Sequence, residues 1–333
     1  MTSAAYEFDH LVFIGRFQPF HHGHEFVVKE ALKQAGQVIL LIGSANSPRT
    51  IKNPFNFEER RQMILGAFGE DERTKIHCLP IDDTLYNDHQ WLQNIQSTIA
   101  RIAPPDARIG IIGHTKDDSS YYLSLFPNWG AIELPSFDNL SATPLRKQYF
   151  TDGIIDERMS MASQAFLAQF LHTPDYARLR DEYRHIQAFK DEWRTAPYPP
   201  IFATTDALVV QSGHILLIER GGEYGHGLWA LPGGFLDVDE SLLGCVLREL
   251  HEETGLNIDK HTLKSRHTFD APDRSPRGRT ITTVFHFELT GESLPTVQAG
   301  DDAKVVFWLP LYALDGKRMF EDHYSIITKI LGI

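Results

Sequence analysis

GFLDVDESLLGCVLRELHEETGL, residues 234–256, is the most specific pattern in this chain. Glycine, glutamate and arginine recur in it at fixed spacings, at Gly234, Glu240, Arg248, Glu249, Glu252, Glu253 and Gly255. Apolar residues between these positions recur at helical spacing, which predicts a helix of about four turns. We expect Asp239 to cap the start of this helix and Gly255 to supply the left-handed residue after its end.

Three glutamates of this helix are placed to bind a cation. Glu249, Glu252 and Glu253 stand at positions i, i+3 and i+4, so their carboxylates are expected on one stripe, away from the apolar face. Carboxylates at this spacing repel one another unless a cation neutralises them, and a hard cation such as Mg²⁺ takes oxygen ligands. For three glutamates alone, an acidic solvated helix face is the simpler interpretation.

The residues around the glutamates favour the metal site. A turn at 232–234 precedes the helix, and glycines at 233 and 234 let main-chain carbonyls approach a metal closely. Arg248 is placed to orient the carboxylates or to contact phosphate. We therefore predict that Gly233 and the three glutamates hold Mg²⁺ or Mn²⁺, and that the glutamates are catalytic.

As a whole, the stretch resembles the signature box of the Nudix hydrolases. The resemblance implies metal-dependent cleavage of nucleoside diphosphates linked to another group. Pro272, sixteen residues after Leu256, is similar to a marker of the ADP-ribose hydrolases in that superfamily. Arg274 and Arg277 beside it are candidates for holding a terminal phosphate or a ribose, and Arg220 is a further candidate for substrate binding. A solvated loop is about as good an interpretation of these arginines.

Composition and charge limit the number of domains and the kinds of binding partner that the chain can have. The chain has 333 residues, 42% hydrophobic and 23% charged, which suggests two globular domains. It has no apolar run of membrane-spanning length, and its start lacks the basic and apolar regions of a signal peptide, so we expect a cytoplasmic protein. The formal charge of −12 argues against binding to nucleic acid or to anionic membranes, and leaves local pockets for small anions open. Whether the protein forms a homo-oligomer is left open.

The first half of the chain alternates apolar strand-like runs with helical patterns, which predicts βαβ units and a parallel sheet. Strands are expected at 11–15, 38–44, 76–81, 109–113 and 131–136. Helices are expected at 23–35, 57–68, 89–102, 156–172 and 175–193. The proline-rich stretch 195–200 is the clearest linker, so we place one domain at 1–194 and a strand-rich α+β domain, built around the box helix, at 201–333.

A second phosphate site is predicted after the first strand, in GRFQPFHHGH at 15–24. This segment opens a helix, where free main-chain N–H groups and the helix dipole favour an anion. His21 and His24 can donate hydrogen bonds to phosphate oxygens, and Arg16 adds a permanent cation. A histidine pair near a helix start is more often incidental, but its place between strand and helix, with Gly15 and Gly23, favours function.

With SATPLR at 141–146, this opening resembles the nucleotidyltransferase superfamily and, more finely, the nicotinamide-mononucleotide adenylyltransferases. Residues 43–60 resemble the next segment of that family. SATPLR departs from the commoner Ser-Ser-Thr or Ser-Gly-Thr spelling at Ala142, a small residue. The resemblance implies a Rossmann-like nucleotidyltransferase domain in which Ser141, Thr143 and Arg146 bind the ATP phosphates.

The resemblance also implies a reaction. The 5′-phosphate of nicotinamide mononucleotide attacks the α-phosphorus of ATP, giving NAD and pyrophosphate, with Mg²⁺ and positioned cations stabilising the charge. The residues suited to this work are His21, His24, Arg16, Lys52 and Arg146. Further substrate contacts are expected from Gly15, Phe17, Gln18, Asn87, Trp91 and Gly113. For Trp91 a core position is an equal alternative, and Gly113 is an ordinary residue for a strand end.

Together, the two segments resemble the bacterial bifunctional adenylyltransferase and ADP-ribose pyrophosphatase family along nearly the whole chain. We therefore predict that the second domain cuts ADP-ribose to AMP and ribose 5-phosphate. Two alternatives are that this domain cleaves another nucleoside diphosphate derivative, or that it is a non-catalytic sensor of an NAD metabolite that regulates the first domain. For the first domain, nicotinate mononucleotide and pantetheine phosphate are alternative acceptors.

Overall fold

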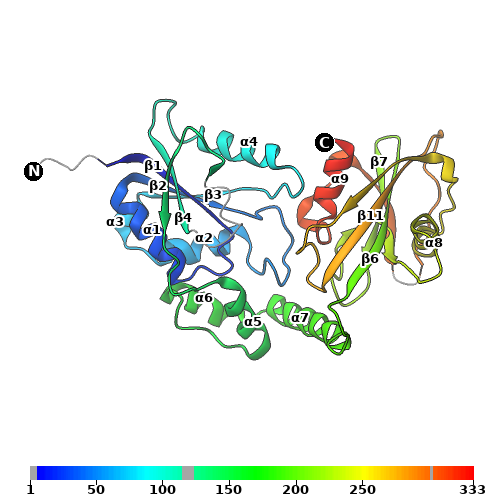
Figure 1. Cartoon of the computed structure of the whole chain (residues 1–333), viewed down its shortest axis with the longest axis horizontal. Coiled ribbons are helices and arrows are strands. Elements are labelled where there is room, and N and C mark those ends of the chain that lie inside the picture. Colours follow the sequence, from blue (N-terminus) through cyan, green and yellow to red (C-terminus); the bar gives the residue numbers. More distant parts are fainter. Residues whose placement is uncertain (1–5, 115–123, 301–302) are drawn as a thin grey trace, which may run out of the picture. The chain divides into compact units, whose positions relative to one another are not determined.

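The computed structural model describes residues 6–114, 124–300 and 303–333. The chain folds as two compact units, Met1–Arg180 and Asp181–Ile333, and the division falls inside α7 (Pro174–Glu192) (Figure 1). The domain limits inferred from the linker stay a prediction. Within the described ranges, no helix is long and apolar enough to cross a membrane.

The first unit contains the predicted parallel sheet. Its strands are β1 (Phe8–Gly15), β2 (Ala35–Ile42), β3 (Ile76–Pro80), β4 (Ile109–His114) and β5 (Gly130–Leu134), in the order β3-β2-β1-β4-β5. Every pairing along this order is parallel. Its other helices are α1 (His22–Gln34), α2 (Phe57–Gly66), α3 (Glu70–Arg73), α4 (Asp88–Ile99), α5 (Ala142–Asp152) and α6 (Met161–Phe170). The Rossmann-like architecture predicted from the alternation of strands and helices is confirmed.

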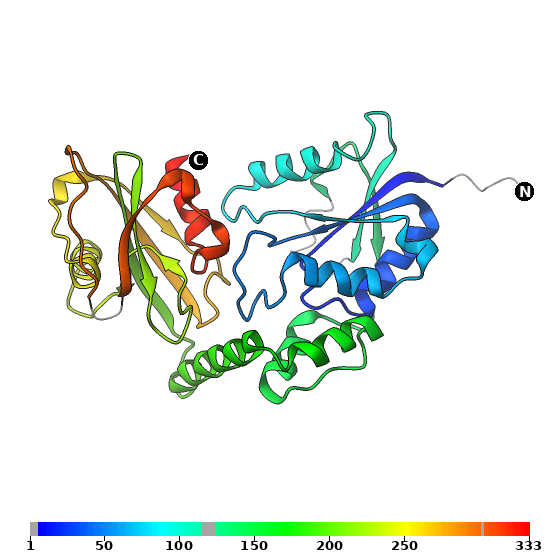
Figure 2. The same cartoon turned by 180° about the vertical axis from the view of Figure 1, so that it is seen from behind.

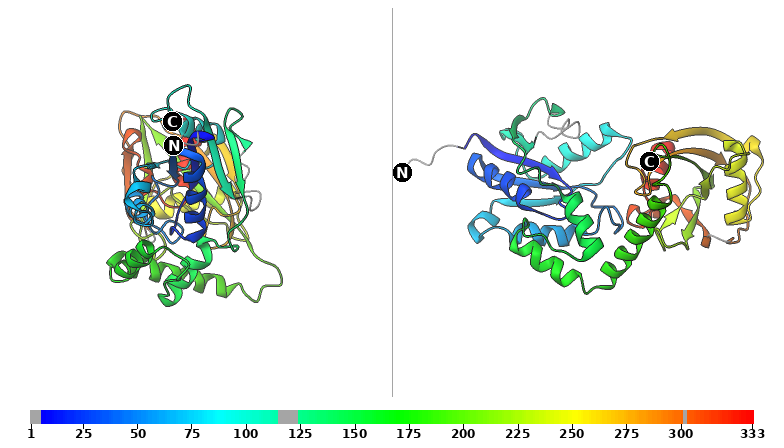
Figure 3. Two further views of the ribbon diagram at one scale, coloured as in Figure 1. Left: turned by 90° about the vertical axis from the view of Figure 1, so that its left-hand side faces the viewer. Right: turned by 60° about the horizontal axis from the view of Figure 1, so that its bottom comes forward.

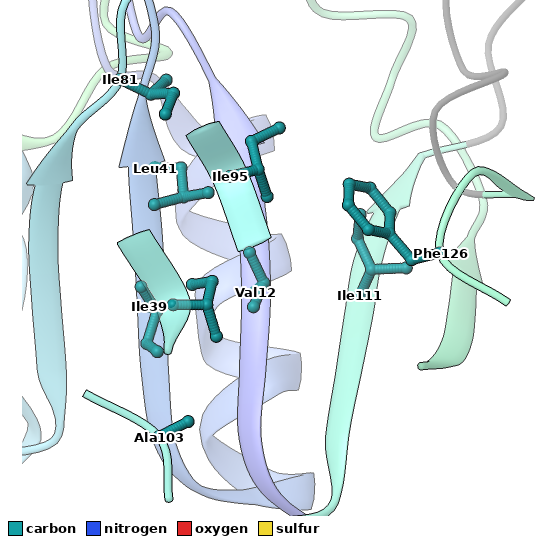
Figure 4. Packing of buried hydrophobic residues seen from close by; sticks show 9 residues of the cluster. Val12, Ile39, Leu41, Ile81, Ile95, Ala103, Ile111 and Phe126 are labelled. Atoms are coloured by element: carbon teal, nitrogen blue, oxygen red, sulfur yellow. The ribbon is translucent and has the colours of Figure 1, made fainter. Parts of the chain in front are cut away.

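Both faces of this sheet are buried, as the continuous apolar strands require. Val12, Ile39 and Ile111, from three neighbouring strands, pack with Ile95 and Ile99 of α4 in one cluster (Figure 4). Helices α1 and α2 cover the other side of the sheet (Figure 2). Helices therefore cover both faces of the sheet, so that a binding site can form only at the ends of its strands.

One predicted helix, 156–172, was wrong at its start, because α6 begins only at Met161. The side chain of Ser160 accepts a hydrogen bond from the main-chain N–H of Ser163 and caps the helix there. Before the cap, the carboxylate of Asp156 accepts hydrogen bonds from the main chain and the guanidinium of Arg158. These local hydrogen bonds replace those that a helix would make in this segment.

The second unit is built on a mixed sheet with strands in the order β10-β11-β6-β7-β12. The strands are β6 (Ile201–Gln211), β7 (His214–Arg220), β8 (Trp229–Ala230), β9 (Gly233–Phe235), β10 (Leu263–Phe269), β11 (Arg279–Glu288) and β12 (Ala303–Pro310). Helices are α8 (Leu242–Thr254) and α9 (His323–Leu331), with 3₁₀ turns at Lys260–Thr262, Leu311–Ala313 and Gly316–Arg318. Only the β11–β6 pair is parallel among the described strand pairs of this sheet.

The box helix α8 packs against one face of this sheet (Figure 3, yellow). Val246 and Leu250 are fully buried in a cluster with apolar residues of β6, β7 and β11. Gly255 follows the helix with a φ of 67°, as predicted. The predicted cap at Asp239 was wrong: Ser241 accepts the hydrogen bond from the N–H of Gly244, so the helix begins two residues later.

Candidate active sites

The first candidate site lies where the order of the parallel strands reverses. β1 is central, with β2 on one side and β4 on the other, and ligands of such sheets bind at the carboxyl ends of the strands beside this point. The segment after β1 enters α1 at His22, and β4 ends at His114. Nε2 of His114 lies 3.3 Å from the carbonyl oxygen of Gly23, so the end of β4 meets the first turn of α1.

The two predicted histidines begin α1. His21 is the N-cap, and its Nδ1 accepts a hydrogen bond from the N–H of Gly23 at 3.2 Å. Nδ1 of His24 accepts from the N–H of His21 at 3.3 Å, and the two rings stack with centroids 3.7 Å apart. A neutral imidazole whose Nδ1 accepts carries its proton on Nε2. Each ring therefore has a donor N–H on its outer nitrogen, at the positive end of a helix.

The predicted arginines converge on the same loop. Nη1 of Arg146, in α5, donates to the carbonyl oxygen of Gln18 at 2.6 Å, and Nη2 lies 3.3 Å from the hydroxyl of Thr143. Burial and the nearby Arg16 lower the pKa of Arg146 to about 10. Two guanidinium groups that repel one another in this way are stabilised by an anion between them. Ser141 stands at the N-cap of α5.

Three residues predicted to contact the substrate, Gly15, Phe17 and Gln18, determine the shape of the loop after β1. Phe17 is 1% exposed with a φ of 51°, and its ring occupies the space where a side chain at Gly15 would lie. The amide of Gln18 bonds the main chain of Phe55 on both sides, accepting from its N–H at 3.0 Å and donating to its carbonyl at 2.8 Å. These side chains hold the loop after β1 against the segment before α2.

The remaining predicted residues of this unit lie on neighbouring elements. Asn87 caps α4, with its side-chain oxygen 3.2 Å from the N–H of Gln90. Trp91 is partly buried against the core cluster, in keeping with the alternative interpretation as a core residue. Gly113 is buried in β4, and Lys52 is half-buried in the loop between β2 and α2.

The second candidate site is formed by the glycine turn and α8. Gly233 donates its N–H to Oε2 of Glu253 at 2.9 Å. A β-carbon at Gly233 would collide with the carbonyl of Thr205, and one at Gly234 with the carboxylate of Glu249. Gly233 must therefore be glycine, because the backbone beside it cannot yield, whereas a side chain at Gly234 would displace the carboxylate of Glu249.

The three glutamates of α8 differ in how exposed they are. Glu253 is 7% exposed because it is drawn into the turn, whereas the Glu252 side chain is 55% exposed. Burial, reinforced by the negative charge of Glu249, raises the pKa of Glu253 to about 8. Burial also raises the pKa of Glu249. Glu253 is therefore poorly compensated as an anion beside Glu249, and favours either a proton or a cation.

Arg248 orients the carboxylates, one of the two roles predicted for it. Its guanidinium donates to both oxygens of Glu240, at 2.7 and 3.2 Å, and to Oε1 of Glu249 at 2.9 Å. The same group reaches Oε2 of Glu252 at 2.8 Å. The side-chain hydrogen bond from Arg248 lowers the pKa of Glu240 to about 2. Glu240 thus fixes the arginine, and the arginine fixes two of the four predicted metal ligands, Glu249 and Glu252.

The donors present fit a hard divalent metal. Carboxylate oxygens are its preferred ligands, and two of them lie against a turn that admits no side chain. In the described part of the chain, however, no group of three His, Cys, Asp or Glu side chains is gathered closely enough to hold a metal. The reason is that Arg248 holds Glu249 and Glu252, while Gly233 holds Glu253. The predicted ligand set therefore remains a prediction.

Comparisons with known proteins find relatives for each half of the chain. A NUDIX domain model matches residues 201–330, and a cytidylyltransferase-like model matches residues 12–101. The chain is 43% identical over 180 residues to the nicotinamide/nicotinic acid mononucleotide adenylyltransferase of Acinetobacter baylyi, covering 54% of this chain and 95% of that protein. It is 37% identical over 123 residues to the ADP-ribose pyrophosphatase of Methanocaldococcus jannaschii, covering 35% of this chain and 70% of that protein.

A solved structure spans both halves. The bifunctional NMN adenylyltransferase/ADP ribose pyrophosphatase from Francisella tularensis matches with a TM-score of 0.90 and 39% identity, over 98% of this chain and 99% of that chain. This chain belongs to that bifunctional family. A second structure of the Francisella protein, 38% identical with a TM-score of 0.90, is complexed with AMP and a Mn ion. The family predicted from the two motifs is confirmed.

Within the Nudix domain, the three predicted arginines have different roles. Arg274 is fully buried in a bidentate ion pair with Asp322, at 2.8 and 3.0 Å, so its guanidinium serves the fold. Arg220 lies over the ring of Phe320, 4.1 Å from its centroid, and burial lowers its pKa. Arg277 stays half-buried and lies close enough to Arg220 for the two positive charges to repel, and Arg220 in turn is attracted by the charge of Glu253.

Sequence reasoning missed a buried acid and histidine behind the glycine turn. Nδ1 of His323 accepts the N–H of Leu231 at 3.0 Å, and its Nε2 lies 3.8 Å from Oδ1 of Asp206. Thr282 donates its hydroxyl to the other oxygen of Asp206. These residues support the turn that carries Gly233. No sequence signal links them, because they come from three separate elements.

In the adenylyltransferase domain, Arg60 and His114 were missed. Arg60 is 1% exposed, and its guanidinium donates to the carbonyl oxygens of Arg16 at 2.8 Å and Gly43 at 2.6 Å. It ties together the segments that follow β1 and β2. His114 directly follows Gly113 at the end of a predicted strand. The rule that ligands gather at strand carboxyl ends beside the reversal point would have found it.

Proposed function

We propose that this protein joins ATP and nicotinamide mononucleotide to give NAD and pyrophosphate, and separately hydrolyses ADP-ribose to AMP and ribose 5-phosphate. The observation that carries the hydrolase is the buried carboxylate of Glu253, held by Gly233 beside Glu249. The observation that supports the transferase is the histidine pair at the start of α1, preceded by the loop to which Arg146 is bonded at Gln18. Membership of the bifunctional family supports the combination.

In the transferase, the chain's own groups position and neutralise phosphate. The Nε2–H groups of His21 and His24 donate to phosphate oxygens at the N-terminus of α1. Arg16 and Arg146 bind between them the anion that relieves their mutual repulsion. In-line attack by the acceptor phosphate on the α-phosphorus then needs no covalent enzyme intermediate. The name of the Acinetobacter relative adds nicotinate mononucleotide as an acceptor to test.

In the hydrolase, we propose that Glu249, Glu252 and Glu253 hold Mg²⁺, with Mn²⁺ able to replace it. The metal supplies an activated water and neutralises the diphosphate when bound. The chain's contribution is to keep Glu249 and Glu252 oriented through Arg248 and to keep Glu253 at the turn. The complete set of carboxylates favours catalysis over the alternative of a sensor that only binds.

Mass spectrometry of the products tests both activities in the intact protein. One reaction contains ATP, nicotinamide mononucleotide and Mg²⁺, and the other contains ADP-ribose and Mg²⁺. We expect NAD in the first, and AMP with ribose 5-phosphate in the second. Glu253→Gln is expected to abolish only the second reaction, and His24→Ala only the first. Intact ADP-ribose that nevertheless binds would support the sensor, and loss of both activities in either variant would contradict independent sites.

A further inference from the structure

The segment 231–233, which leads into the glycine turn of the hydrolase, is held through its main chain by three different elements. The N–H of Leu231 donates to Nδ1 of His323 in α9 at 3.0 Å. The carbonyl oxygen of Pro232 accepts a main-chain N–H of β6 at 2.7 Å, and the N–H of Gly233 donates to a carboxylate of α8 at 2.9 Å. The contact from α9 is made by a side chain to which the proposed reactions give no part.

Three polar side chains are buried together behind this segment. His323 is 4% exposed, Asp206 is 7% exposed and Thr282 is 0% exposed. Nε2 of His323 lies 3.8 Å from Oδ1 of Asp206, and Thr282 donates its hydroxyl to the other carboxylate oxygen. Burying polar groups costs free energy that apolar side chains of the same size would not cost. The hydrogen bond that the imidazole makes to Leu231 is one that an apolar side chain could not make.

The imidazole ring is held in one orientation. A neutral ring that accepts a hydrogen bond at Nδ1 carries its proton on Nε2, and Nε2 of His323 faces the carboxylate of Asp206. Asp206 pairs with Gly233 between β6 and β9, and its Oδ1 lies 2.9 Å from the place where a β-carbon of Gly233 would be. The same carboxylate oxygen therefore lies against both the imidazole ring and the glycine.

The start of α9 is fixed by two further contacts. Asp322, the residue before the helix, accepts the bidentate ion pair from Arg274, and both side chains are almost fully buried. The N–H of Phe320 donates to the carbonyl oxygen of Trp229 in β8 at 2.7 Å. His323 follows Asp322 directly as the first residue of α9. These contacts fix the helix end from which the imidazole reaches the main chain before the glycine turn.

We propose that His323 is a positioning residue of the hydrolase, which sets the affinity of the site for a divalent metal through the main chain that carries Gly233. The inference rests on the proposed function, because it concerns the main chain beside the proposed metal ligand Glu253. Without the imidazole, the buried N–H of Leu231 loses its hydrogen bond, and the segment must move to satisfy it. Residues that orient metal ligands from outside the ligand shell change metal affinity by about 10–100-fold when they are lost.

Binding of Mn²⁺ to the intact protein, measured by electron paramagnetic resonance without nucleotide, tests the proposal. The binding that Glu253→Gln abolishes is assigned to the hydrolase site. For His323→Phe, which keeps a ring without an acceptor, we expect the dissociation constant at this site to rise by about 10–100-fold. His323→Asn is expected to bind nearly as tightly as the wild type, because its side-chain oxygen replaces Nδ1 as the acceptor. Saturating Mn²⁺ is expected to restore ADP-ribose hydrolysis in His323→Phe, and NAD synthesis should stay unchanged.

Ile327→Val is the matched control. Ile327 is fully buried in the same helix, so the change removes a buried methyl group from α9 and no hydrogen bond, and the affinity for Mn²⁺ is expected to stay unchanged. Hydrogen exchange at the amide of Leu231, measured in EDTA, is a second readout that needs no metal. We expect faster exchange in His323→Phe, and wild-type exchange in His323→Asn and Ile327→Val.

Wild-type affinity for Mn²⁺ in His323→Phe would overturn the proposal, with NAD synthesis confirming that the variant is folded. So would an equal weakening in His323→Asn or Ile327→Val, because the packing of the ring or of α9 would then explain the effect. Failure of the proposed function gives a different result. If the wild type binds Mn²⁺ through Glu253 but leaves ADP-ribose intact, the hydrolase fails and the affinities still decide the role of His323. If it shows no such binding, both fail.

Discussion

Replacing Glu253 with glutamine is expected to stabilise the metal-free protein while it abolishes hydrolysis. Glutamine has nearly the same shape, and its side-chain oxygen can still accept the N–H of Gly233. What it removes is a carboxylate that is 7% exposed and lies beside the charge of Glu249. When no metal is bound, carboxylates arranged to hold a metal lower the stability of the folded protein.

The magnitude follows from the pKa of Glu253, which burial raises from 4.5 to about 8. Between these values the folded protein keeps a proton that the unfolded chain has lost. Raising the pH therefore lowers the free energy of unfolding through this window, by about 1.36 kcal/mol per pH unit. At a pH of about 7.5, the carboxylate of Glu253 lowers the free energy of unfolding by at most about 4 kcal/mol. Structural relaxation around the charge reduces this loss to about 2–4 kcal/mol. At a pH of about 5 it is below about 1 kcal/mol.

Denaturant unfolding in EDTA, at the two pH values, measures this difference. Glu253→Gln is expected to be more stable than the wild type by about 2–4 kcal/mol at the higher pH, and nearly equal at the lower pH. Adding Mg²⁺ is expected to stabilise the wild type but not the variant. Glu252→Gln is the matched control, because its side chain is 55% exposed and its loss should change stability little. A Glu253→Gln variant that is equally or less stable than wild type in EDTA at the higher pH would refute the reasoning.

Three further substitutions test the fold around the sites, each by denaturant unfolding. Arg274→Met leaves Asp322 buried without its ion-pair partner and should cost about 3–5 kcal/mol, whereas replacing both partners with apolar residues should cost less. Gly255→Ala forces a side chain into a left-handed conformation with a φ of 67°, and should cost about 1 kcal/mol. Gln18→Ala leaves both main-chain groups of Phe55 unsatisfied and should cost about 2 kcal/mol, with a higher KM for ATP.

The fold was predictable where the pattern was local. Continuous apolar strands alternating with helices require a parallel sheet covered on both faces, and the observed sheet has that form. The box spacing likewise placed the helix that carries Glu249 and Glu253. The two wrong predictions of helix starts also have local causes. Ser241, not Asp239, caps α8, and Ser160 caps α6, which therefore starts later than predicted. In both cases a short polar side chain bonds the main chain and fixes where the helix starts.

Residue roles were less predictable, because they depend on partners far along the chain. In the sequence Arg274 looks like a loop cation ready for phosphate, and only folding brings it to Asp322, 48 residues away. Gln18 sits inside a phosphate-site motif, yet its amide is bonded to Phe55, 37 residues away. Spacing shows which residues gather near a site. Only the contacts show which of them support it and which face the ligand.

Arg248 explains why the box spacing fixes an arginine among glutamates. Without a metal, this guanidinium compensates Glu249 and Glu252 by direct hydrogen bonds, and Glu240 fixes the guanidinium through two more. Glu253 lies outside its reach, and its buried carboxyl favours a proton instead. The site is thus neutralised in two different ways, by an internal cation on one side and by a proton on the other. A divalent metal would be held by Glu249, Glu252 and Glu253 only after the first two side chains turned away from Arg248, and it would supply the positive charge that the proton on Glu253 now supplies.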